Sequence, residues 1–84
     1  MATVLYFAWV REKVGKSEEE LELPSNVRTV ADLLHHLRGQ SSFHAEALGD
    51  EKRLRVAVNQ EHVDMNAPVG GDDEIAIFPP VTGG

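Results

Sequence analysis

The fold is decided near the carboxyl end, where an apolar run leads without a linker into a proline-stiffened tail: Ile75-Ala76-Ile77-Phe78-Pro79-Pro80-Val81-Thr82-Gly83-Gly84. The apolar run predicts a strand, and Pro79 and Pro80 favour an extended backbone after it. Gly83 and Gly84 carry no Cβ, so this end could enter a channel too narrow for side chains. The functional group at its tip is the carboxylate of Gly84, which we expect to be the reactive group.

The composition predicts one small globular domain. The chain has 84 residues, 42% of them hydrophobic, which is enough for a single core. It has no cysteine, so disulfides, thiolate metal sites and a cysteine nucleophile are excluded. No apolar stretch approaches the ~18 residues of a membrane span and no signal peptide opens the chain, so we expect a cytoplasmic location. The net charge of -6 argues against nucleic acid and favours a partner with a basic docking surface.

The first half of the chain predicts two strands and one main helix. Residues 3–9 are rich in β-branched and aromatic side chains and predict a strand, followed by a helical turn over 10–15 that ends at Gly15. Residues 18–23 predict a half-buried strand paired with the first. Thr29 is predicted to cap a helix, with Asp32 completing a capping box. The apolar stripe of that helix is Val30, Leu33, Leu34 and Leu37, and Gly39 ends it.

The second half predicts a shorter helix and three further strands. Ser41 or Ser42 would cap the helix, and residues 54–58, 62–63 and 75–78 would form the strands. The simplest arrangement is α+β: a mixed sheet of about five strands, one main helix packed on one face, and one or two short helices. This is the β-grasp, or ubiquitin-like, fold. We expect residues 1–78 to form the domain and residues 79–84 an extended Gly-Gly tail.

Three segments resemble the small, ubiquitin-like sulfur-carrier subunits of molybdopterin synthase. Residues 4–12, with Val14 and Gly15, match the first strand and turn of that family. Residues 57–60, Ala-Val-Asn-Gln, match its third strand, and residues 71–84 match its ending with Asp73 as one residue more than the usual Gly-Asp-Glu. The resemblance covers essentially the whole chain, although residues 25–53 match only in pattern. Trp9 and His62 depart from the residue types expected at their positions.

The resemblance implies a chemistry for the tail. A separate activating enzyme would use ATP to adenylate the carboxylate of Gly84, and a sulfur donor protein would then supply sulfur to give a thiocarboxylate. The large subunit of the synthase, joined to this chain in a heterotetramer, would hold the catalytic pocket in which that sulfur passes to cyclic pyranopterin monophosphate. We expect no cofactor on this chain itself. Gly70 and Gly71 lack the Lys-Ser/Thr of a phosphate-binding loop.

Strand alternation predicts a partner-binding face opposite the main helix. The helix-facing residues would be Val4, Tyr6, Ala8, Ile75 and Ile77. The residues of the other face would be Leu5, Phe7, Trp9, Ala76 and Phe78. An apolar face on so small a domain marks a binding site, unless loops cover it. We therefore predict that Leu5, Phe7, Trp9 and Phe78 bind the large subunit, and that the tail residues Pro79, Pro80, Val81, Thr82 and Gly83 carry Gly84 into its partners.

The histidines and the acidic run favour structural roles. His35 and His36 are adjacent on the predicted helix and point about 100° apart, so they cannot form a metal-binding i, i+4 pair. With His44 and His62 they predict no metal site. The run Glu18-Glu19-Glu20 is interpreted as a solvated strand edge that resists edge pairing.

Two other classes of function fit the same features. The chain could carry sulfur for another pathway, such as thiamine synthesis, cysteine synthesis or tRNA thiolation, or could modify proteins by joining to lysine. It could also be a plain interaction module whose Gly-Gly ending is incidental. The ending at residues 78–84 and the Ala-Val-Asn-Gln segment favour molybdopterin synthesis.

Overall fold

The structure is a computed structural model that describes residues 1–80. Its elements, in chain order, are β1 (Ala2–Tyr6), α1 (Ala8–Val14), β2 (Glu18–Leu21), α2 (Val30–Arg38), α3 (Ser42–Ala47), the 3-10 helix η1 (Glu51–Arg53), β3 (Arg55–Val58), β4 (Glu61–Val63) and β5 (Glu74–Phe78). No helix in this part of the chain is long and apolar enough to cross a membrane.

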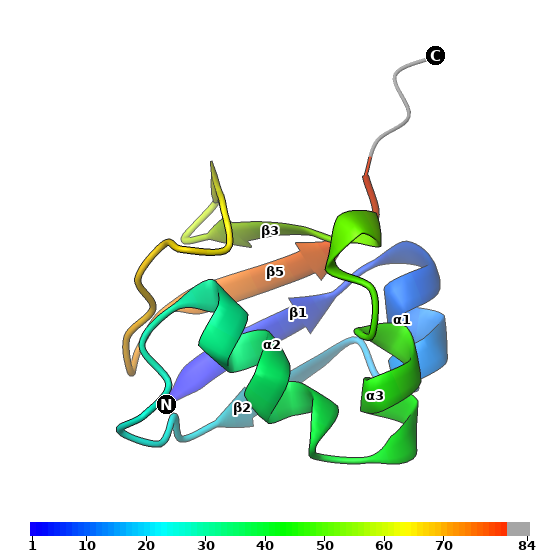
Figure 1. Ribbon diagram of the computed structural model, residues 1–84, viewed down its shortest axis with the longest axis horizontal. Helices are drawn as coiled ribbons and strands as arrows, with labels where there is room; N and C mark the ends of the chain where they lie inside the picture. Colours follow the sequence, from blue (N-terminus) through cyan, green and yellow to red (C-terminus); the bar gives the residue numbers. More distant parts are fainter. Residues whose placement is uncertain (81–84) are drawn as a thin grey trace.

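The five strands form one mixed sheet in the order β2-β1-β5-β3-β4. β1 and β5 are parallel, with Val4 opposite Ile75 and Tyr6 opposite Ile77, and the other pairings are antiparallel. Figure 1 shows α2 crossing one face of this sheet, with α1 and α3 together at one end. The β-grasp prediction is therefore confirmed, and the strand that leads into the tail lies at the centre of the sheet.

The core lies between the sheet and α2. Val4, Ile75 and Ile77 are fully buried, and Tyr6 is nearly so, as strand alternation predicts. From α2, the whole predicted stripe is buried as well. Thr29 and Asp32 form the predicted capping box, in which each side chain accepts a hydrogen bond from the other residue's backbone N–H. Cap and stripe together fix where α2 begins and which face it turns to the sheet.

The prediction of one strand over residues 3–9 is wrong at its end. β1 stops at Tyr6, Phe7 caps α1, and Trp9 belongs to the helix. Ala8 makes the change of direction with φ 54°, in the left-handed region that residues with a Cβ seldom occupy. Trp9 therefore does not continue the outer row of the strand. The predicted end at Gly15 is confirmed, since Gly15 takes φ 90° and its N–H bonds the carbonyl of Arg11.

A two-residue hairpin explains the Ala-Val-Asn-Gln segment. Asn59 and Gln60 connect β3 to β4 with φ 51° and φ 69°, the two positive values that a type I′ turn requires. The Asn59 side chain also donates to Asp73 at 3.0 Å and accepts from the N–H of Glu74 at 3.0 Å. Asp73 accepts from Gly70 N–H at 2.7 Å. These bonds tie the hairpin to the start of β5.

Candidate functional site

The sheet face opposite α2 carries a partly exposed apolar surface. Leu5, Ala76 and Phe78 are half-buried there, and 46% of Phe7 is exposed. Leu5 lies opposite Ala76 in the parallel ladder, and the N–H of Phe7 donates to Ile77 O at 3.1 Å, which brings Phe7 level with the end of β5. We call this set (Leu5, Phe7, Ala76 and Phe78) the outer face. It contains the predicted partner-binding residues except Trp9.

His62 and Ala57 extend the outer face across β3 and β4. Ala57 lies opposite both Ala76 and His62 in the two ladders it joins. The His62 ring meets Phe78 edge-on, with ring centroids 5.4 Å apart. The inward alternation of Val56 and Val58 already implied that Ala57 points outward. The position of His62 depends on the register of the hairpin, which the sequence does not specify, so this residue was not predicted to lie beside Phe78.

Trp9 lies instead beside the root of the tail. A hollow of about 260 Å³ is lined by Trp9, Lys52, Arg53, Pro79 and Pro80. Two cations lie over the indole ring: the Arg53 guanidinium carbon at 5.1 Å and the Lys13 Nζ at 5.9 Å from its centroid. In Figure 1 the chain leaves β5 beside η1, which carries both Lys52 and Arg53. We call this set of five lining residues the tail-root hollow, and sequence reasoning missed its cationic side.

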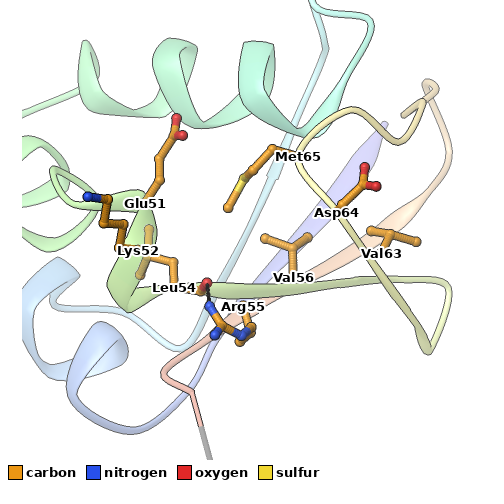
Figure 2. A pocket seen from close by; sticks show the side chains of 8 residues that line it. All are labelled: Glu51, Lys52, Leu54, Arg55, Val56, Val63, Asp64 and Met65. Atoms are coloured by element: carbon orange, nitrogen blue, oxygen red, sulfur yellow. Dashed lines mark hydrogen bonds between the residues drawn. The ribbon is translucent and has the colours of Figure 1, made fainter.

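A second, larger hollow of about 460 Å³ lies over β3 and β4. Figure 2 shows an apolar floor that includes Val56, Val63 and Met65, with the carboxylates of Glu51 and Asp64 at its rim. Arg55 turns aside and donates to the carbonyl of Leu54 at 2.9 Å. None of its eight lining residues is a serine, cysteine or histidine, so this hollow holds none of the usual nucleophile–base pairs.

A polar cluster under α3 corrects the interpretation of the acidic run. Glu19 is half-buried, and its Oε2 accepts from the Tyr6 hydroxyl at 2.6 Å and from His44 Nε2 at 2.8 Å. His44 is 5% exposed, and its Nδ1 meets the Ser41 hydroxyl at 2.7 Å. Glu18 and Glu20 are solvated as predicted, but Glu19 is not. Alternation back from Leu21 and Leu23 would have placed it on the inner face.

This cluster is structural. The Ser41 hydroxyl accepts from the N–H of His44 as the cap of α3, so it is committed to the helix and is no free nucleophile. Burial alone would raise the pKa of Glu19, but the hydrogen bonds from Tyr6 and His44, with the charges of His44 and Lys16, bring it below its ordinary value. Burial, followed by the hydrogen bond and charge of Glu19, raises the pKa of the Tyr6 hydroxyl above its usual range. Tyr6 therefore remains a hydrogen-bond donor at neutral pH.

No group of three or more histidine, aspartate or glutamate residues in the described part of the chain is arranged to hold a metal ion. The predicted reactive residue Gly84, with Val81, Thr82 and Gly83, lies outside the described residues. Within residues 1–80 the site consists of two surfaces near the start of the tail. The outer face includes Phe78, the last residue of β5, and the tail-root hollow is lined in part by Pro79 and Pro80, which follow it.

The fold and this surface define a small ubiquitin-like domain. The model of the ThiS family matches residues 4–84, and the chain belongs to that family. It is 46% identical over the full length of both chains to the molybdopterin synthase sulfur carrier subunit of Escherichia coli strain K12. The subunit of the same name from Haemophilus influenzae is 38% identical over the full length of both.

Solved structures agree with the fold. A putative molybdopterin converting factor, subunit 1, from Pyrococcus furiosus superposes with a TM-score of 0.76 at 32% identity, covering 95% of this chain and 97% of that one. SAMP1 from Haloferax volcanii superposes with a TM-score of 0.74 at 26% identity, covering 99% of this chain and 98% of that one. The family predicted from the three sequence segments is confirmed.

Proposed function

We propose that this protein is the sulfur carrier subunit of molybdopterin synthase and that its Gly84 carboxylate carries the sulfur. The observation that supports this most directly is the 46% identity, over both full lengths, to the Escherichia coli protein of that name. The Phe78-Pro79-Pro80-Val81-Thr82-Gly83-Gly84 ending supplies the group that the function needs. Nothing in the reaction calls for a catalytic pocket on this chain.

The chemistry begins with activation of a poor electrophile. A carboxylate resists substitution because its leaving group would be oxide. An ATP-dependent activating enzyme joins the Gly84 carboxylate to AMP and releases pyrophosphate. A sulfur donor protein then supplies sulfur, AMP leaves, and a thiocarboxylate remains. Its sulfur is a better nucleophile than carboxylate oxygen and forms a bond to carbon of cyclic pyranopterin monophosphate. Water then cleaves the bond between sulfur and the Gly84 acyl carbon, which restores the carboxylate. Two such transfers supply the two sulfurs of the dithiolene of molybdopterin.

The outer face is the proposed docking surface for the large subunit, whose pocket would hold the substrate. Exposed aromatic side chains such as Phe7 are typical binding anchors. Phe78 is the last residue of a central strand, so docking there sets the origin of the tail. From Pro79 to Gly84 is six residues, which reach at most roughly 20 Å when extended. The complex would be a cytoplasmic heterotetramer.

Intact mass spectrometry tests the proposal. The protein is incubated with ATP, a cognate activating enzyme and a sulfur source. We expect a mass gain of roughly 16 units, the difference between sulfur and oxygen. The matched control is the chain lacking Gly84, which should melt at the same temperature because a terminal residue buries little. No mass gain on the full chain, or molybdopterin formation by the truncated chain, would rule the proposal out.

A second function is supported by the likeness to small archaeal modifier protein 1. The likeness to SAMP1, a small archaeal modifier protein, favours a role in which Gly84 is joined to lysine amines of other proteins. This function needs the same adenylate but no sulfur. It predicts covalent conjugates in cell extracts that resist reduction and vanish when Gly84 is deleted. Their absence, together with the thiocarboxylate mass, would leave sulfur transfer as the function.

A further inference from the structure

We propose that the tail-root hollow is a docking site for an acidic segment of the large subunit of molybdopterin synthase. The proposal rests on the proposed function, since it concerns how the carrier binds that partner. It assigns Trp9, Lys52 and Arg53 to charge recognition, whereas the outer face supplies apolar contact. Both surfaces adjoin the same exit of the tail.

The charge of the hollow is opposite to that of the whole molecule. The protein carries a net charge of -6, yet the charged residues that line this hollow are Lys52 and Arg53. Lys13 adds a third cation over the Trp9 ring and reaches one carboxylate, Glu46, at 3.8 Å. Neither Lys52 nor Arg53 has an ion-pair partner within residues 1–80. A partner carboxylate would therefore meet cations that are not already neutralised.

The residue types of the hollow suit a protein interface. Tryptophan and arginine, with tyrosine, are enriched among energetically dominant interface residues. Here the Arg53 guanidinium lies 5.1 Å from the indole centroid, so the ring holds the cation in place before any partner binds. Pro79 and Pro80 complete the lining. Proline restricts the backbone, so little conformational entropy is lost when this wall is covered.

A small anion such as phosphate fits the hollow less well. Phosphate sites usually use backbone N–H groups at a helix start or a turn. In η1 those groups are already engaged: Lys52 N–H donates to Asp50 Oδ1, Arg53 N–H to Asp50 O, and Leu54 N–H to Glu51 O. A small anion would be held by long side chains alone. A protein segment can instead bind the cations while it covers the indole and the prolines.

The hollow and the outer face are joined along the chain. Trp9 lies two residues beyond Phe7, and Pro79 directly follows Phe78. A partner that covers Phe7 and Phe78 and also receives the tail must pass the tail-root hollow. The relatives are subunits of molybdopterin synthase. A subunit stays associated with its complex, which favours the large subunit over the activating enzyme as the partner.

Charge reversal at Arg53 tests the proposal. The binding of Arg53→Glu to the large subunit from the same organism is measured by titration calorimetry. The matched control is Arg28→Glu, an equal change of charge at an exposed residue ahead of α2. We expect Arg53→Glu to weaken binding about tenfold or more and Arg28→Glu to change it less than about twofold. Raising the salt from about 0.05 M to about 0.5 M should weaken the wild-type complex and reduce the difference between wild type and Arg53→Glu.

Each other outcome overturns the proposal. Equal binding by wild type and Arg53→Glu would exclude the hollow from the interface, and equal loss in Arg28→Glu would indicate a general charge effect. Arg53-dependent binding of inorganic phosphate, with unchanged affinity for the large subunit, would make it a small-anion site. Loss of binding to the activating enzyme alone would assign it to that enzyme. Arg53→Glu should still gain the thiocarboxylate mass, so failure of docking is distinguishable from failure of the proposed function.

Discussion

The two sides of β1 and β5 differ in how much of their apolar side chains is exposed. Toward α2, the side chains of Val4, Ile75 and Ile77 are completely buried. On the outer face, Leu5 and Phe78 are half-buried and Phe7 is 46% exposed. Val4 and Leu5 are neighbours in β1, and Ile75, Ile77 and Phe78 lie in β5, while Phe7 directly follows β1. All are apolar, so position and not residue type separates the two sets.

Because of this difference in exposure, one side of a strand contributes to folding and the other side is available for binding. A side chain that is already out of water contributes to the stability of the isolated domain, at roughly 25 cal/mol per Å² of apolar surface. A side chain that is still exposed can contribute the same amount only when a partner covers it. Substitutions on the two sides should therefore change different measurements. Substitutions at Gly83 and Gly84, beyond both surfaces, should change the chemistry of the carboxyl end and leave the stability of the domain unchanged.

The largest effect is expected for Gly83→Val. The branched side chain would obstruct a tail that has to enter the active sites of two proteins, so adenylation or sulfur transfer should be lost while folding stays normal. Thiocarboxylate formation by intact mass and molybdopterin formation with the large subunit separate the two half-reactions. Full activity in both half-reactions would mean that the channels of the two partner proteins admit side chains, and that Gly83 is not needed for its small size.

Ile77→Ala should cost the most stability. Ile77 is fully buried against the core, and its truncation leaves a cavity that typically costs about 2–5 kcal/mol. Urea unfolding monitored by the single tryptophan, Trp9, gives the free energy directly. A loss below about 1 kcal/mol would contradict the assignment of this side of β5 to the core.

Phe7→Ala should mainly weaken binding. Truncating an aromatic anchor at an interface centre commonly costs at least ~2 kcal/mol, roughly thirtyfold in affinity for the large subunit. The isolated domain should lose much less stability than Ile77→Ala does, since Phe7 is 46% exposed. Titration calorimetry and thermal melts of the same sample check both halves. A greater stability loss for Phe7→Ala than for Ile77→Ala would reverse the assignment of the two faces.

Glu19→Gln tests the polar cluster of Tyr6, Glu19 and His44, which lies on the side of the sheet that faces the helices. It weakens the bonds that Glu19 accepts from Tyr6 and His44, and we expect a loss of about 1–2 kcal/mol at neutral pH. The pKa of Glu19 is lower in the folded state than its ordinary value of 4.5. The stabilisation is therefore present above that value and is lost as the pH falls through the folded pKa. Unfolding at neutral pH and near pH 3 should show the difference from wild type shrinking in acid.

The neighbouring substitution Glu18→Gln is the control for that experiment. Glu18 is exposed, so its replacement should change stability by less than about 0.5 kcal/mol at either pH. If both variants behave alike, the cluster of Tyr6, Glu19 and His44 does not stabilise the domain.

The smallest effect is expected for Gln60→Gly, which leaves both faces intact. Gln60 takes φ 69° in the β3–β4 hairpin, a conformation that costs a residue with a Cβ roughly 1 kcal/mol relative to glycine. Removing this strain should raise stability by up to about 1 kcal/mol and leave binding unchanged. Denaturant midpoints and calorimetry check this. A changed affinity for the large subunit would mean that the hairpin, which His62 follows two residues later, belongs to the docking surface.

Local sequence patterns were sufficient to predict the helices and strands that several independent patterns indicate. α2 has a cap, a capping box and a four-residue apolar stripe, and all three agree, so it was correctly predicted. The two sides of β1 and β5 follow from alternation alone. Residues 3–9 were misassigned at their end because an apolar run does not reveal that Ala8 takes a left-handed conformation, which sends Trp9 into a helix.

The tail-root hollow could not be predicted, because it depends on tertiary structure. Arg53 meets Trp9 only because η1 leads into β3 and β3 pairs with β5, and no local pattern specifies that encounter. The burial of His44 against Glu19 likewise joins residues 25 positions apart. The inward orientation of Glu19, by contrast, could have been predicted from period-two alternation. It was not, because the exposed glutamates on either side made the whole run look solvated.

The central position of β5 has a consequence for how the protein is made. Before residues 74–78 have been synthesised, the nascent chain can form only two separate strand pairs, β2-β1 and β3-β4. A two-stranded pair is at best marginally stable in water. The sheet therefore has to wait for its last strand, which joins both pairs through contacts distant in sequence. A chain released before this strand is made would lack the centre of its sheet and be open to proteolysis. Every folded copy therefore contains the strand that leads into Pro79 and Pro80.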